Sequence, residues 1–287
     1  MRVLVLGSDG LLGSRIFSEL QSIDQLETIG TSRSDSKKLL FNFSCRNLAH
    51  LLRLTRPDYV INCIALTSKK SGWLDSIRIN SVLPLQLSVL RKIYGYQTVH
   101  FSTNAVFSGF RKKYSEKKIP FPTTKYGFTK ALGDLCLFNS LVIRTSFIGV
   151  ALSSSKTHGL VSQLKHRQIS ESFDLDRDFY WNGVTVDVLV VLIRNLLMRE
   201  IKLSGLVHFF SADVLIRHEV VRLILEKLEK SQMHIAITHQ GNVKNFSLDS
   251  DRCEQHLHLW GLAGFEIVPG IAHLLTEMKT TSSPNGV

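Results

Sequence analysis

The sequence is short of cysteine and has no long apolar run, and both absences limit what the protein can be. No stretch of its 287 residues approaches the roughly 18 consecutive apolar residues that a membrane crossing needs. The apolar run at residues 3–6 is too short for the core of a signal peptide, and no cleavage pattern follows it. The four cysteines are scattered without CxxC spacing, which favours a reduced compartment over a disulfide framework. We therefore expect a cytoplasmic protein without membrane insertion.

Composition and spacing also argue against nucleic-acid and metal binding. The 35 Lys and Arg exceed the 24 Asp and Glu, giving a formal net charge of +11 that could attract a phosphate backbone. The densest basic run, residues 111–118, has no aromatic-interleaved module around it, so we expect a solvated loop or attraction for a small anion instead. Cys253, His256 and His258 lie close together, but no second pair stands at a ligand spacing, so no metal is predicted.

Short β-branched runs alternate with amphipathic stretches in the first half of the chain, which is typical of βαβ units and a parallel sheet. The expected strands are residues 3–6, 27–31, 59–63, 99–102 and 141–144, and the expected helices are 11–20, 47–55, 76–94 and 124–137. Later segments include a mobile loop at 153–159, helices at 160–166, 185–198 and 217–229, and a strand at 206–210. We predict an α/β fold with a doubly wound parallel sheet in residues 1–149, a smaller α/β lobe in 150–280 with some segments returning to the sheet, and a flexible tail at 281–287.

A glycine-rich turn follows the first expected strand directly and opens the first helix. Gly7 permits a tight turn, Gly10 lets the backbone approach a pyrophosphate, and Gly13 allows the helix to pack closely on the sheet. The free N–H groups at the start of the helix then face the anion. The spacing is GxxGxxG, not the usual GxGxxG, and such a turn can also be a simple connector. Its position at the first strand–helix junction favours a dinucleotide site.

The end of the second strand indicates which dinucleotide would bind. An acid there would hold the ribose 2′-hydroxyl of NAD, whereas an arginine suits the 2′-phosphate of NADP. The segment contains Arg33 and no acid before Asp35, and Lys37 and Lys38 follow as further cations. NADP(H) is therefore the preferred cofactor, with NAD(H) left open. The alternative is that Arg33 is simply an exposed residue in a polar turn.

Tyr126 and Lys130 form a YxxxK pattern, which places a phenol and an ammonium on one helix face. We expect the cation to lower the pKa of the phenol from about 10 towards the working pH, so that Tyr126 can exchange a proton with a carbonyl oxygen. Ser102 and Thr103 end the fourth strand, where open α/β sheets place ligands, and a hydroxyl there can bind the same oxygen. A surface helix is the alternative for the pattern alone, but the three elements occur in a consistent order.

These motifs together resemble the extended short-chain dehydrogenase/reductases, in particular the dTDP-4-dehydrorhamnose reductase-like branch. The resemblance covers roughly residues 1–273 and rests on the segments 5–13, 56–63, 99–109, 126–130 and 143–146. It implies a Rossmann-like sheet and a C-terminal lobe that binds substrate.

The resemblance also implies a role for each matching residue. Hydride would pass from the nicotinamide to a keto carbon, with Tyr126 as general acid, Lys130 lowering its pKa and holding the nicotinamide ribose, and Thr103 polarising the carbonyl. Further cofactor contacts are implied for the pyrophosphate (Leu11 and Leu12), for the adenine (Asn42 and Phe43), along the cofactor (Ile64, Ala65 and Leu66) and on the helix after the third strand (Asn80).

Substrate contacts are implied for Ser102, Thr103, Asn104 and Phe147, and here the chain departs from the pattern. The family commonly has Asp and Tyr where this chain has Asn104 and Ala105, which argues against a 4,6-dehydratase. An Asp near the adenine is replaced by Asn42, a frequent His by Leu66, and a Trp by Phe147. The proton-transfer residues are kept while the substrate residues differ, so we expect a different sugar or a loss of activity.

The resulting hypothesis is an NADPH-dependent reductase of a keto group on a nucleotide-linked deoxysugar, serving surface polysaccharide synthesis. Two alternatives remain. One is a nucleotide-sugar epimerase, in which the same Tyr and Lys return the hydride to the other face. The other is a non-catalytic NAD(P)-binding regulatory subunit, of the methionine adenosyltransferase beta-subunit type. A nucleotide sugar is the expected partner, and a homodimer is left open.

Overall fold

The computed structural model describes residues 1–35, 37–68, 70–135, 139–150, 152, 159–176, 179–238 and 243–279. The expected tail at 281–287 lies outside the described residues, as does the expected mobile loop except for Gly159. Across the described ranges, no helix combines the length and apolarity needed to cross a membrane.

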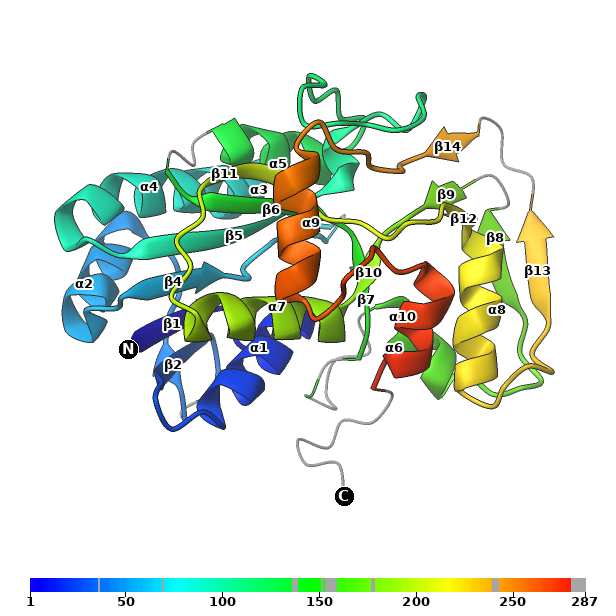
Figure 1. Ribbon diagram of the computed structural model, residues 1–287, viewed down its shortest axis with the longest axis horizontal. Coiled ribbons are helices and arrows are strands. Elements are labelled where there is room, and N and C mark those ends of the chain that lie inside the picture. Colours follow the sequence, from blue (N-terminus) through cyan, green and yellow to red (C-terminus); the bar gives the residue numbers. More distant parts are fainter. Residues whose placement is uncertain are drawn as a thin grey trace.

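A parallel sheet of seven strands forms the centre of the molecule (Figure 1). Its order is β11-β6-β5-β4-β1-β2-β3. The strands are β1 (Arg2–Leu6), β2 (Glu27–Ser32), β3 (Leu39–Leu40), β4 (Tyr59–Asn62), β5 (Gln97–Thr103), β6 (Leu141–Thr145) and β11 (Gly205–His208). The chain proceeds outwards from β1 in one direction through β2 and β3, and in the other through β4, β5 and β6. The strand order therefore reverses beside β1, where open α/β sheets bind ligands.

Helices cover both faces of this sheet, because the central strands are apolar on both sides. Val3 and Val5 face one core, whereas Leu4 and Leu6 face the other. The first face carries α1 (Leu11–Gln21), α7 (Val186–Met198) and α9 (Cys253–Leu262), and the second carries α2 (Cys45–Thr55), α4 (Leu83–Tyr94) and α5 (Lys125–Leu135).

A smaller lobe, built from short strands and helices, lies beyond the carboxyl ends of the sheet strands (Figure 1). Its strands pair as β7 (Phe147–Ile148) with β10 (Val184–Thr185), β8 (Phe173–Asp176) with β13 (Ile235–Thr238), and β9 (Phe179–Trp181) with β12 (Leu215–Ile216) and β14 (Lys244–Asn245). Its helices are α6 (Leu160–His166), α8 (Arg217–Lys227) and α10 (Ile271–Glu277). Between this lobe's segments the chain returns to the sheet as α7 and β11.

The doubly wound parallel sheet is confirmed, and the expected strands match β1, β2, β4, β5, β6 and β11 within one or two residues. The helix expected at 76–94 is instead three segments. These are α3 (Trp73–Ile77), a π-helical turn η1 (Arg78–Val82) and α4. Such a turn shifts the following side chains around the helix axis, which periodicity does not reveal. The strands of the smaller lobe are too short for a pattern of alternation, and α9 and α10 were not expected.

Candidate active site

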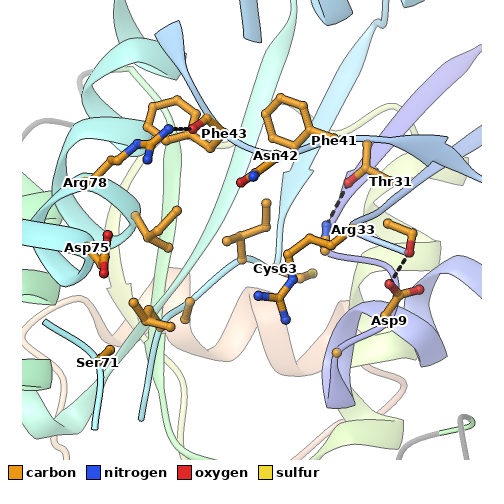
Figure 2. A pocket seen from close by; sticks show the side chains of 17 residues that line it. Asp9, Thr31, Arg33, Phe41, Asn42, Phe43, Cys63, Ser71, Asp75 and Arg78 are labelled. Atoms are coloured by element: carbon orange, nitrogen blue, oxygen red, sulfur yellow. Dashed lines mark hydrogen bonds between the residues drawn. The ribbon is translucent and has the colours of Figure 1, made fainter. Parts of the chain in front are cut away.

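A groove of about 410 Å³ opens at the carboxyl ends of β1, β2 and β4 (Figure 2). It lies where the strand order reverses, so the fold alone places it where a dinucleotide would bind. Eight predicted cofactor residues line it: Gly7, Gly10, Arg33, Asn42, Phe43, Ile64, Ala65 and Leu66. Several lining residues were not predicted from the sequence: Asp9, Thr31, Ser32, Phe41, Cys63, Ser71, Asp75, Arg78 and Ile79.

The glycine-rich turn has the geometry that an anion cradle requires. Gly7 has a φ of +80°, which glycine adopts without strain. The N–H of Gly10 donates to the carbonyl oxygen of Gly7 at 3.0 Å. A Cβ on Gly13 would lie 2.3 Å from that same oxygen, so only glycine lets α1 start so close to the turn. The first N–H groups of α1 have no partner within the helix and are free to face a phosphate.

Leu11 and Leu12 follow the turn, but their side chains do not line the groove. The Leu12 side chain is buried in the core beneath α1, and Leu11 packs against the same core. Any contact of these residues with a pyrophosphate would therefore be through the backbone N–H groups of the first helical turn.

Arg33 extends into the groove from the end of β2 (Figure 2). It is exposed and makes no ion pair with any other residue in the described ranges. Lys38, expected to assist it, is instead bound to the glycine-rich turn, with its ammonium 2.9 Å from the Asp9 carboxylate and 3.1 Å from the Ser8 carbonyl oxygen. Asp9 also accepts a hydrogen bond from Ser32, so the carboxylate joins Lys38 and β2 to the turn.

The outer wall of the groove is formed by residues 41–43 and by Arg78. Asn42 faces the groove between the buried rings of Phe41 and Phe43. Arg78 donates to the carbonyl oxygen of Phe43, and its guanidinium lies 5.9 Å from the Phe43 ring centroid. A cation thus stacks on the wall where the adenine was expected, which no sequence pattern had indicated.

The inner wall, residues 64–66, is held in place by two buried asparagines. Asn62 accepts a hydrogen bond from the N–H of Ile64 at 3.1 Å. Asn80 accepts from the N–H of Leu66 at 2.9 Å and donates to the Leu66 carbonyl oxygen and to the Thr129 hydroxyl. Asn80 was predicted to contact the cofactor, but its amide is occupied by these bonds. It acts on the groove by fixing Leu66 against α5.

Lys130 on α5 is fully buried and does not itself line the groove. Its ammonium nitrogen lies 2.8 Å from Nε2 of His100 and 2.7 Å from the carbonyl oxygen of Phe101, both on β5. Burial lowers the pKa of Lys130 to about 8, against the opposing charges of Asp134 and Cys63. Cys63 lines the groove, and burial raises its pKa to about 12 despite the nearby charge of Lys130. Cys63 is therefore the groove residue that is electrostatically coupled to Lys130.

The side chains of Tyr126 and Thr103 lie close enough for Thr103 to lower the pKa of the phenol. The expected fall in the pKa of Tyr126 is wrong for this structure. Burial raises that pKa to about 12, Thr103 opposes the rise, and the charge of Asp134 adds to it. Burial is the largest of these effects, and the Lys130 nitrogen is bonded to His100 and Phe101 in this structure.

The close approach of α5 to this site depends on two glycines that sequence reasoning did not single out. A Cβ on Gly127 would lie 2.0 Å from the carbonyl oxygen of Ala105, in the 3-10 turn η2 (Asn104–Val106). A Cβ on Gly133 would lie 2.1 Å from the carbonyl oxygen of Asn80. Both positions therefore require glycine. The only trace of this requirement in the sequence is that the two glycines lie three residues before and three residues after Lys130.

Ser102 and Asn104 were predicted to contact substrate, and both make protein contacts instead. Ser102 donates to Asp134 at 2.7 Å, and the same carboxylate oxygen pairs with the buried guanidinium of Arg144 at 2.9 Å. Asn104 donates to the carbonyl oxygen of Phe246 in the smaller lobe at 3.1 Å. Ser102 therefore links β5 to α5, and Asn104 links the sheet to the lobe.

A second hollow of about 200 Å³ lies in the smaller lobe, lined by Ser146, Ile148, Leu160, Phe179, Trp181, Arg217 and Val220. The Arg217 guanidinium lies 5.4 Å from the Phe179 ring centroid, and the Trp181 indole donates to Ser146. Phe147, expected as an aromatic wall of the substrate site, does not line this hollow. It lies between Ser146 and Ile148 on an extended segment, so it points the other way and packs against the main core.

The histidines and cysteine at 253–258 belong to α9. His256 is buried, stacks on Phe210 and hydrogen-bonds the carbonyl oxygen of His208, while Cys253 is exposed. Over the described parts of the chain, no three His, Cys, Asp or Glu side chains are placed to hold a metal ion.

Comparison with known families gives one match over most of the chain. The family described as RmlD substrate binding domain matches residues 1–247. A dTDP-4-keto-6-deoxy-D-glucose reductase of Streptomyces niveus is 24% identical over 243 residues, covering 79% of this chain and 78% of that protein. Methionine adenosyltransferase 2 subunit beta of Mus musculus is 25% identical over 181 residues, and the match spans about half (52%) of its length and 60% of this chain.

Solved structures show the same fold. The crystal structure of a dTDP-4-dehydrorhamnose reductase from Bacillus anthracis, in complex with NADP, superposes with a TM-score of 0.79 at 21% identity. The superposition covers 96% of this chain and 98% of that one.

Proposed function

We propose that this chain, which belongs to the RmlD substrate binding domain family, reduces a keto group on a nucleotide-linked deoxysugar with NADPH. One observation carries the proposal. A groove at the switch point of the sheet has the lining that a dinucleotide needs, and one of its lining residues, Cys63, is electrostatically coupled to the buried Lys130, which follows Tyr126 by one helical turn of α5. Such a reaction would serve surface polysaccharide synthesis.

The residues present fit a nicotinamide dinucleotide. Because Gly13 has no side chain, α1 starts close to the glycine-rich turn, where its N–H groups can bind a pyrophosphate. Asn42 and Phe43 supply a wall for the adenine, and the guanidinium of Arg78 lies over the Phe43 ring. Arg33 supplies a cation for a 2′-phosphate, which supports NADP(H) over NAD(H). When bound, the reduced nicotinamide supplies hydride to the carbonyl carbon of the substrate.

The chain's own residues supply the proton and the orientation. Thr103 Oγ1 and Tyr126 Oη would both bind the carbonyl oxygen, and the Tyr126 proton moves to that oxygen as it becomes an alcohol. A pKa of about 12 keeps this proton on Tyr126 at neutral pH, so the residue is ready to act as an acid. Lys130, when protonated, stabilises the tyrosinate that remains.

The second hollow is suited to the nucleotide end of the substrate. Its aromatic walls, Phe179 and Trp181, suit a flat base, and Arg217 adds a cation for a diphosphate. Its lining residue Ser146 follows Thr145, which pairs with Thr103 across β5 and β6.

An exposed apolar surface on the second helical layer supports a homodimer. Leu85, Val89 and Ile93 repeat every four residues along α4 and are all exposed, and α5 beside it exposes Phe128 and Leu135. We expect light scattering after gel filtration to give twice the monomer mass, and Val89→Asp to give the monomer mass. A monomeric wild type would contradict the dimer.

NADPH oxidation against a panel of keto-sugar nucleotides tests the function. A reductase consumes NADPH in proportion to the sugar reduced, whereas an epimerase returns the hydride and shows no net consumption. Formation of epimerised sugar without net loss of NADPH would favour an epimerase. NADPH binding with no turnover on any sugar, together with stimulation of a partner enzyme, would favour a regulatory subunit.

A further inference from the structure

A buried chain of hydrogen bonds runs from the backbone of Ile64 to the nitrogen of Lys130. The N–H of Ile64 lies 3.1 Å from Oδ1 of Asn62, and Nδ2 of Asn62 lies 2.9 Å from Nδ1 of His100. Nε2 of His100 lies 2.8 Å from Nζ of Lys130. Asn62, His100 and Lys130 are each 1% exposed, so no solvent intervenes.

The direction of these bonds is determined at one end. A backbone N–H can only donate, so the atom of Asn62 that faces Ile64 is its oxygen, and its NH₂ group faces His100. Nδ1 of His100 must then accept, and the single proton of the neutral imidazole is on Nε2. A doubly protonated ring would direct an N–H at the Asn62 NH₂ group, and burial likewise lowers the pKa of His100 well below its usual value.

The N–H on Nε2 is directed at Lys130. An ammonium group has three donors and no lone pair, whereas a neutral amine has one lone pair and two N–H bonds. The neutral form can accept from His100 and still donate to the Phe101 carbonyl oxygen at 2.7 Å. We propose that Asn62 and His100 are positioning residues that present Lys130 with a hydrogen-bond donor and so favour its neutral amine over its ammonium form.

Other groups around Lys130 also affect its protonation, some in the same direction as Asn62 and His100 and some in the opposite direction. The titratable groups that interact with it are His100 on β5, Cys63 after β4, and Asp134 on its own helix. Burial favours the neutral amine, and a charged Asp134 or Cys63 opposes it. Arg144 on β6 pairs with Asp134 and so weakens that opposition.

The catalytic consequence rests on the proposed function. In that reaction the ammonium form of Lys130 stabilises the tyrosinate, so a donor held against Lys130 reduces the active population as the pH rises past about 8. Asn62 and His100 would thereby place the alkaline limb of the pH profile near neutrality. Neither residue touches substrate or cofactor in this account, and both act through Lys130.

Nitrogen NMR of the free wild-type protein tests the tautomer without any assumption about activity. We expect His100 to show a protonated Nε2 and an unprotonated Nδ1 across neutral pH. A proton on Nδ1 would overturn the inference, because Nε2 would then accept from an ammonium group.

Titration of ¹³C-labelled lysine side chains tests the effect on Lys130, whose signal is identified by its loss in Lys130→Met. In Asn62→Asp the new carboxylate accepts from both Ile64 and Nδ1, which moves the ring proton and frees Nε2 to accept from the ammonium. We expect the pKa of Lys130 to rise by about one unit or more. His100→Gln, which removes the fixed donor without adding charge, should raise it too, whereas His256→Gln, a buried histidine on α9, should not.

The possible outcomes test the role of Asn62 and His100 separately from the proposed reductase function. An unchanged Lys130 titration in His100→Gln contradicts the inference even if Asn62→Asp fails to fold. A raised pKa with a matching upward move of the alkaline limb of kcat supports both the inference and the reductase. If the wild type reduces no keto-sugar nucleotide, the proposed function fails, while the NMR titrations still decide the role of Asn62 and His100.

Discussion

The ammonium group of Lys38 lies 2.9 Å from the carboxylate of Asp9, within the turn that begins the dinucleotide groove. This ion pair commits Lys38 to the protein, and Arg33 remains as the cation that extends into the groove from the end of β2. The proposed preference for NADPH should therefore depend on Arg33.

Arg33→Ala should weaken NADPH binding about 10- to 100-fold, since a hydrogen bond to a charged group contributes roughly 1.5–3 kcal/mol. NADH binding should be unchanged, because the 2′-hydroxyl of NADH does not need the guanidinium. Isothermal titration with both cofactors measures this. Arg53→Ala, which removes an equal charge from the outer part of α2, is the control. Equal losses for both cofactors would contradict a role for Arg33 at the 2′-phosphate.

Gly13→Ala should disrupt the turn, because its Cβ would lie 2.3 Å from the carbonyl oxygen of Gly7 and the backbone there must move. We expect loss of NADPH binding and a lower melting temperature. Gly261→Ala on α9 is a matched control, since nothing lies within 4 Å of its Cβ. In a helix that change should stabilise the protein by about 0.5–1 kcal/mol. Wild-type NADPH affinity in Gly13→Ala would refute the close-packing argument.

Ser102 and Thr103 are neighbours on β5 whose substitutions should differ in their effect on kcat. Ser102→Ala removes a buried hydrogen bond to Asp134 and should cost about 1.5–3 kcal/mol of unfolding free energy with little change in kcat. Thr103→Val removes the hydroxyl that accepts from the N–H of Ala105 and caps η2, so it should cost about 1 kcal/mol of unfolding free energy. It should also lower kcat, because the hydroxyl beside Tyr126 is lost. Urea unfolding and steady-state kinetics on both variants separate the roles. A large loss of kcat in Ser102→Ala would return Ser102 to the substrate site.

Much of the sheet and the groove could be predicted from the sequence because they depend on local order. The glycine-rich turn, Arg33 and residues 64–66 each follow a strand that is recognisable by itself. Ser102 and Asn80 were misassigned because their partners are distant in sequence. Asp134 meets Ser102 only after α5 packs on the sheet, and that packing depends on Gly127 and Gly133.

The smaller lobe was less predictable for a related reason. Its strands have two to four residues and pair with segments far away in the chain, so no alternation is long enough to register. Phe147 illustrates the result. The sequence shows that Phe147 is aromatic but does not show which way its side chain points. That orientation depends on the pairing of β7 with β10, in which Ser146 and Ile148 line the second hollow.

The buried Lys130 should leave a signature in the stability of the protein against pH. Its pKa is about 8 in the folded state and near 10.5 in the unfolded chain, so the unfolded chain binds more protons between these values. Stability from this group therefore rises with pH across that window, by about 3 kcal/mol in total. Lys130→Met should lack this rise when urea unfolding is measured at several pH values. A constant difference between wild type and variant from pH 7 to 10 would contradict the depressed pKa.

The central claim is that Tyr126 donates the proton in a reduction that takes place in this groove. Tyr126→Phe keeps the ring and removes only the hydroxyl, so the most direct test measures its NADPH binding and its rate of keto-sugar reduction together. We expect unchanged NADPH affinity and a fall in kcat of about 100-fold or more, the usual contribution of a positioned acid. Wild-type turnover by Tyr126→Phe would contradict the account.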